Sequence, residues 1–193
     1  VAQNISVLFS SGNEGSSTEI GSPACISSTI PISSTDKADA ISSFSNRNGL
    51  IKLFATGGTS SGTTTCSDPN NPSANYICST GYQGGYLHKS GTSMAAPMVA
   101  GAIAILNQQL NLSNQTRTPS EIEDILYDMG LQFTEGSNNF SRIDVYSALL
   151  SLDVDSPNVT LVSPVDSHVN SSVNQTFICN ATDWQLANAT LKV

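Results

Sequence analysis

The segment GTSMAAP, residues 91–97, has the composition expected around a nucleophilic serine. A serine hydroxyl attacks a carbonyl only when it is exposed at a fixed point, a base can accept its proton, and hydrogen-bond donors await the developing oxyanion. The small residues after Ser93 predict an Ala-rich helix that begins near Thr92. Its N-terminus would place the Ser93 N–H and the positive end of the helix dipole beside the reacting carbonyl. Gly91 would let substrate and chain pass close together.

The residues that follow Ser93 extend this pattern, since GTSMAAPMVAGA resembles the nucleophile signature of the subtilisin-like serine proteases, the subtilase family. The family commonly has His where this chain has Met98, and that position is structural. Upstream, SSGNEG at residues 10–15 resembles the family segment whose Asn side chain is the second oxyanion donor, a role that the resemblance assigns to Asn13. By itself Ser93 would more often be a helix cap, and Asn13 a turn residue.

The resemblance also implies a substrate site and a fold. Ser10, Ser11 and Gly12 are expected to line one side of the specificity pocket, with Gly91 and Thr92 also contacting substrate. Weaker similarities at FSNRNGLIKLFATG and SRIDVYSAL extend the resemblance over about residues 4–151. The family's catalytic Asp and His both precede the oxyanion Asn, so they are expected upstream of this chain. We therefore expect the 193 residues alone to be inactive and poorly folded.

Short apolar runs at 4–10, 23–35 and 50–54 predict buried strands, and the later periodicity predicts helices. The helices are expected from Thr92 onward with Pro97 near the first turn, from Pro119 to a stop at Gly130, and over about 143–151. This order suits an α/β domain, and the resemblance implies a subtilisin-like three-layer fold with a mostly parallel sheet, incomplete in this chain.

A change in composition near residue 153 predicts two domains, 1–152 and 153–193. In the second, VTLVSPV, VNQTFICNA and ANATLKV alternate between apolar and polar residues, which is typical of antiparallel strands. Three strands are too few to close a sandwich, so this tail is expected to be the start of an Ig-like β domain, a partial β-sandwich.

Composition indicates an extracellular surface. The formal net charge is −8 with a pI near 4.4 and only seven basic residues, which argues against nucleic acid or anionic lipid as a partner. No run reaches the ~18 apolar residues of a membrane-spanning helix. Nine of the seventeen asparagines begin Asn-x-Ser/Thr glycosylation signals, namely Asn4, Asn111, Asn114, Asn139, Asn158, Asn170, Asn174, Asn180 and Asn188. A secreted or cell-surface glycoprotein is expected.

Cys66 and Cys78 enclose a polar, turn-rich stretch and are expected to form a disulfide. Cys25 and Cys179 have no assigned partners, and either could be a buried thiol. His88 is interpreted as a solvent-facing loop residue rather than a replacement base, and His168 as exposed. No zinc spacing is present. No cofactor is expected, and calcium as a structural ion follows only from the family resemblance, because no Asp-rich loop specifies a site.

Two functions of different classes follow. The first is a serine endopeptidase that cleaves protein or peptide substrates through an acyl-enzyme at Ser93, with Asn13 in the oxyanion hole. The second is a catalytically inactive, glycosylated cell-surface module for adhesion or structure. Intact Ser93 and Asn13 favour the first.

Overall fold

A computed structural model describes residues 4–59, 63–66, 76–153, 158–163 and 178–182. The chain consists of two compact units, residues 1–152 and residues 153–193, and each is described by itself. None of the helices in the described ranges combines the length and apolarity needed to cross a bilayer.

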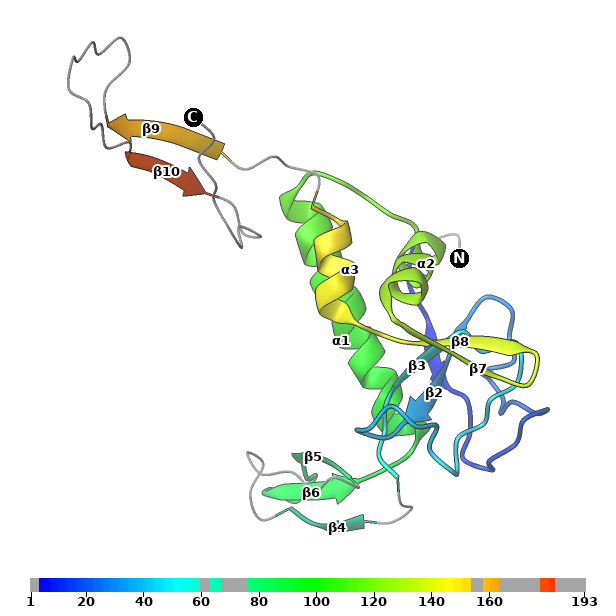
Figure 1. Cartoon of the computed structure of the whole chain (residues 1–193). Coiled ribbons are helices and arrows are strands. Elements are labelled where there is room, and N and C mark those ends of the chain that lie inside the picture. The colour runs from blue at the N-terminus through cyan, green and yellow to red at the C-terminus, as the bar shows by residue number, and fades with distance from the viewer. Residues whose placement is uncertain (1–3, 60–62, 67–75, 154–157, 164–177, 183–193) are drawn as a thin grey trace. The chain divides into compact units, whose positions relative to one another are not determined.

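The first unit contains a five-stranded sheet in the order β1-β2-β3-β8-β7 (Figure 1). Its strands are β1 (Leu8–Ser10), β2 (Ile30–Thr35), β3 (Leu53–Thr56), β8 (Asn138–Arg142) and β7 (Leu131–Glu135). The neighbours from β1 to β8 pair in parallel, and only β7 is antiparallel to β8. The expected α/β fold with a mostly parallel sheet is therefore confirmed.

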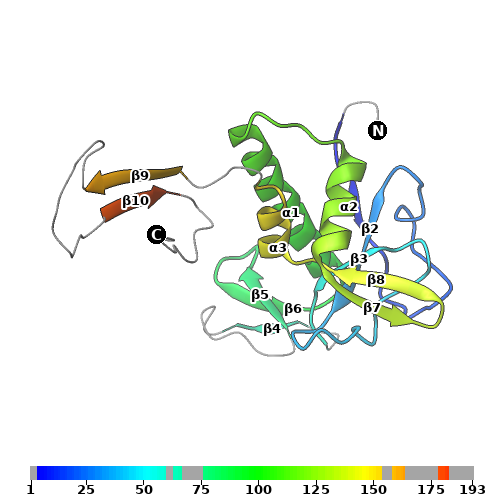
Figure 2. The same cartoon turned by 45° about the horizontal axis from the view of Figure 1, so that its top comes forward.

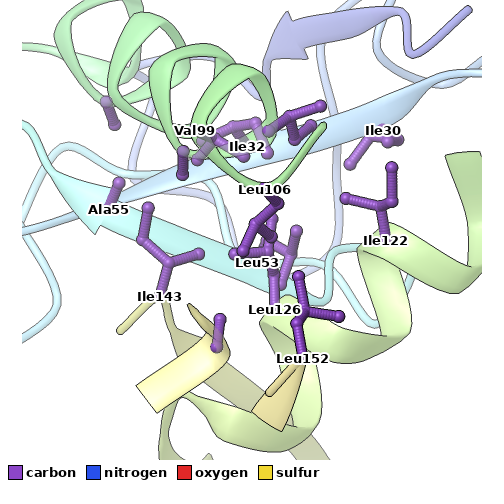
Figure 3. Packing of buried hydrophobic residues seen from close by; sticks show 14 of the residues in the cluster. Ile30, Ile32, Leu53, Ala55, Val99, Leu106, Ile122, Leu126, Ile143 and Leu152 are labelled. Carbon is purple, nitrogen blue, oxygen red and sulfur yellow. The ribbon is translucent and has the colours of Figure 1, made fainter. Parts of the chain in front are cut away.

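Three helices lie on one side of this sheet, as Figures 1 and 2 show: α1 (Thr92–Leu112), α2 (Pro119–Met129) and α3 (Val145–Ser151). Helix α1 buries Val99 and Leu106, two turns apart, in one cluster with Ile32 and Leu53 of the sheet (Figure 3), and Leu110 belongs to the same cluster. All three helices contribute to this one cluster. The predicted helices are confirmed, although Pro97 is the sixth residue of α1 and so lies beyond its first turn.

The opposite face of the sheet carries a smaller apolar cluster. Phe54 points away from α1 because side chains alternate along a strand, and it packs with Ile51 and Phe140. The Phe54 and Phe140 ring centroids are 4.9 Å apart. Of the three expected layers, the described residues thus provide the sheet and one helical layer.

A second sheet, which the sequence did not predict, precedes α1. It is antiparallel in the order β4-β6-β5, with β4 at Thr63–Thr65, β6 at Tyr86–Lys89 and β5 at Ile77–Thr80. The predicted disulfide is confirmed here, since Cys66 and Cys78 are bonded across it. Cys25 is an exposed free thiol, so the expectation that it could be buried is wrong for this residue.

The second unit contains an antiparallel strand pair, β9 (Asn158–Ser163) and β10 (Ile178–Thr182). These strands coincide with two of the three predicted ones, and the third, residues 187–193, lies outside the described residues, as does His168. The described pair does not show a β-sandwich, so an Ig-like domain stays a prediction.

Candidate active site

Ser93 is the second residue of α1 and its side chain is exposed. Gly91 has no side chain that could cap the helix, and in the first turn the Thr92 N–H donates to Asn13 Oδ1 and the Met94 N–H to the Gly91 carbonyl. Within the described part of the chain, no acceptor is paired with the Ser93 N–H. Pro97 has no N–H to donate to the Ser93 carbonyl four residues earlier. The exposed Ser93 hydroxyl and the unbonded Ser93 N–H thus belong to one residue at the positive end of a 21-residue helix.

Gly91 fixes the chain just before Thr92 and Ser93. Its N–H donates to the Gly57 carbonyl at 2.9 Å, and its own carbonyl accepts from the Met94 N–H at 2.9 Å. Its φ of 147° lies in a region that residues with a Cβ rarely adopt. Gly57 follows the end of β3, so this bond ties the chain two residues before Ser93 to the carboxyl edge of the main sheet.

Asn13, from the loop after β1, reaches the same point. The Thr92 N–H donates to Asn13 Oδ1 at 2.9 Å, and the Thr92 hydroxyl donates to the same oxygen at 3.1 Å. Thr92 is completely buried, whereas the Asn13 side chain is exposed. Because both bonds use the oxygen of the Asn13 amide, its NH2 group remains available as a donor. The amide lies beside Gly91 and Thr92, the two residues that precede Ser93.

The other predicted substrate-binding residues differ in their burial and in their hydrogen bonds. Ser10 ends β1, and Gly12 is half-buried with its carbonyl 3.4 Å from the Thr92 hydroxyl. Ser11 is completely buried, and its hydroxyl bonds to that of Ser33 at 2.8 Å. The side chains of Ser11 and Thr92 therefore bond within the protein, and a substrate contact of any of these residues stays a prediction.

His88 does not lie in a loop, and that interpretation is wrong. It is half-buried in β6, and its ring stacks on Tyr76 with centroids 5.7 Å apart. In the described ranges, Cys66, Cys78 and His88 form the one group of His, Cys, Asp or Glu side chains close enough to share a metal ion. The two sulfurs are bonded to each other, so they cannot bind metal as thiolates.

The three carboxyl groups with shifted pKa values lie in α2 or at the start of α3. The Ser147 backbone N–H donates to Asp144 at the start of α3 and lowers the pKa of that carboxyl. A backbone hydrogen bond from Thr118 lowers the pKa of Glu121 in the capping box of α2. Burial raises the pKa of Glu123, in the same helix. None of these three groups is hydrogen-bonded to Ser93 or Asn13.

One residue of the site was not singled out from the sequence. Asn46 is almost fully buried beneath the Asn13 loop and hydrogen-bonds to it on both sides of Asn13. The segment FSNRNG, which contains Asn46, did carry a weak family similarity, but nothing in it indicated a contact with a loop 30 residues earlier.

The chain is similar in sequence to known proteases. The sequence model of the Subtilase family matches residues 1–140. The chain is 32% identical over 126 residues to alkaline serine exoprotease A of Vibrio alginolyticus, covering 65% of this chain and 20% of that protein. It is 30% identical over 131 residues to an extracellular protease of Xanthomonas campestris, covering 65% and 20% respectively.

Among solved structures, proteases from Pseudoalteromonas arctica match with a TM-score of 0.63 at 24% identity, covering 78% of this chain and 43% of that one. At this identity the match supports the fold alone. The chain spans about a fifth of the two relatives named above.

Proposed function

Because the chain belongs to the subtilase family, we propose that it supplies the nucleophile and the oxyanion site of a serine endopeptidase. The observation that carries this proposal is the pair of hydrogen bonds from Thr92 to Asn13 Oδ1, at 2.9 and 3.1 Å. They hold the Asn13 amide, from a segment 79 residues earlier, against the residue that precedes Ser93, and this supports a role for its NH2 group as an oxyanion donor.

In the proposed reaction, Ser93 Oγ attacks the carbonyl carbon of the scissile peptide bond. Its proton passes to the family's His, which together with the Asp lies upstream of Asn13 in the full-length protein. The Asn13 NH2 and the Ser93 N–H then donate to the oxyanion of the tetrahedral intermediate. The His returns the proton to the departing amine, which leaves Ser93 acylated, and water hydrolyses the ester. The substrates are proteins or peptides, and the reaction requires no cofactor; calcium as a structural ion stays a prediction.

We propose a secreted or cell-surface location. The side chains of Asn4, Asn111, Asn114 and Asn139, the four glycosylation signals of the first unit, are all exposed. Exposure at each position is compatible with N-linked glycans. Residues 153–193 would begin an Ig-like domain that anchors the peptidase at the surface or acts as a spacer. The exposure of the glycosylation signals also supports the rival function, an inactive glycosylated surface module for adhesion or structure.

Labelling with a fluorophosphonate probe distinguishes these functions in the full-length protein. An activated Ser93 displaces fluoride and becomes covalently labelled, so the wild type should react and Ser93→Ala should not. Ser120→Ala is the matched control, because Ser120 is likewise an exposed second residue of a helix, α2. Folded wild-type protein that takes up no probe would refute the peptidase and favour the surface module.

A further inference from the structure

One buried side chain holds the loop that carries Asn13. Asn46 is 2% exposed, and its Nδ2 donates to the Ser11 carbonyl at 3.1 Å and to Glu14 Oε2 at 2.7 Å. Its Oδ1 accepts from the Ser16 N–H at 2.9 Å. A single amide therefore bonds to residues on both sides of Asn13, and both of its ends are used.

The backbone of Asn46 adds further bonds to the same loop. Its N–H donates to the Gly12 carbonyl at 3.2 Å, and its carbonyl accepts from the Ser11 hydroxyl at 3.3 Å and from the Ser33 hydroxyl. Gly12 has a φ of +112°, and a Cβ there would collide with the Asn46 and Glu14 side chains. The close contact thus depends on glycine, and Asn46 and the loop pack as one unit.

We propose that Asn46 is a positioning residue for the oxyanion site, acting through Asn13. This inference rests on the function proposed above. Thr92 fixes only the oxygen end of the Asn13 amide, so the direction of its NH2 group also depends on where the backbone of residues 11–16 lies. Asn46 is the side chain that bonds to this backbone before and after Asn13. Such a buried, fully bonded support is what keeps a donor aimed before the reaction begins.

The test is a double-mutant cycle in the full-length protein, with kcat and KM measured on a peptide substrate. Asn46→Ala is expected to lower kcat by about 10- to 100-fold, since small displacements of a catalytic group have effects of this size, and to change KM by less than about threefold. In an Asn13→Ala background the same substitution should change kcat by less than about threefold. Equal losses in both backgrounds would overturn the positioning role.

Asn48→Ala is the matched control. Asn48 also donates a side-chain hydrogen bond to this part of the chain, but its acceptor is the Thr18 carbonyl, at 2.6 Å, which lies outside residues 11–16. We expect its kcat to stay within about twofold of wild type. Asn46→Asp combined with Glu14→Gln keeps the shape and the acceptor for the Ser16 N–H, loses the donor to the Ser11 carbonyl and avoids two facing carboxylates, so it covers the case in which Asn46→Ala does not fold. It should retain a cooperative unfolding transition with a reduced kcat.

Hydrogen exchange at the Ser16 amide tests the support without requiring activity. Asn46→Ala should speed exchange there, whereas Asn48→Ala should not. Unchanged exchange in Asn46→Ala would overturn the inference even in an inactive protein. By contrast, an active enzyme whose kcat is unchanged by Asn13→Ala would refute the oxyanion role in the proposed function, and the Ser16 exchange rate would still decide whether Asn46 holds the loop.

Discussion

Thr92→Val tests how the Asn13 amide is aimed, because the substitution removes one of two bonds and preserves shape. The hydroxyl that donates to Asn13 Oδ1 at 3.1 Å is lost, and the backbone N–H at 2.9 Å remains. The Asn13 oxygen is therefore still bonded, so the loss should be near the net value of one hydrogen bond, about 1 kcal/mol. If that bond holds the Asn13 donor in place, kcat falls about fivefold.

This loss should be much smaller than that of removing the donor itself. Asn13→Ala eliminates an oxyanion donor and should lower kcat by about 100- to 1000-fold. The assay is the initial rate on a fluorogenic peptide, normalised to active sites titrated with a covalent inhibitor. Thr92→Ser keeps the hydroxyl and should stay within about twofold of wild type. A Thr92→Val loss as large as that of Asn13→Ala, or an equal loss in Thr92→Ser, would refute the reasoning.

Three further predictions concern stability, measured by denaturant or acid unfolding of the nucleophile-deficient full-length protein. Replacing both Cys66 and Cys78 by Ser opens a loop closed over 12 residues and should destabilise its sheet by about 3 kcal/mol; a change below about 0.5 kcal/mol would contradict this. Leu106→Ala should cost about 2–5 kcal/mol because Leu106 is completely buried, whereas Leu112→Ala, at a position 73% exposed, should cost less than about 0.5 kcal/mol. Asp144 has a lowered pKa in the folded protein, so the stabilisation from its carboxylate is present above pH 3.8 and is lost as the pH falls through the folded-state pKa. Asp144→Asn still caps α3 but does not titrate, so its free energy of unfolding should fall less steeply below pH 3.8 than that of the parent protein. Equal slopes for the two proteins would rule this out.

The helices were predictable because their signals are local. The helix that was expected from Pro119 does begin there, and Thr118 and Glu121 form a reciprocal capping box at its start. Ser93 was likewise evident, since its whole motif is contiguous in sequence. The fold brings Asn13 into contact with Thr92, the residue before Ser93, and the roles of Asn13 and Ser93 in catalysis stay predictions.

Other features depend on distant partners and left little trace in the sequence. Strand β2 is buried at all six residues although half of them are Ser or Thr. The Ser33 and Ser34 hydroxyls can be buried because they bond to Ser11 and Ser42, and no hydrophobic pattern in the sequence indicates these partners. The β7–β8 hairpin was missed because seven of its ten residues are polar and only half of the ten are exposed, so no clear alternation marks it as a strand pair.

The wide separation in sequence between Asn13 and Thr92 has a consequence during biosynthesis. Asn13 leaves the ribosome 79 residues before Thr92, and the two meet only after α1 has docked on the sheet. A nascent or partly unfolded chain therefore has no assembled oxyanion site. The proposed hydrolytic activity would be silent during synthesis and lost on local unfolding, so that folding itself protects the producing cell from premature proteolysis.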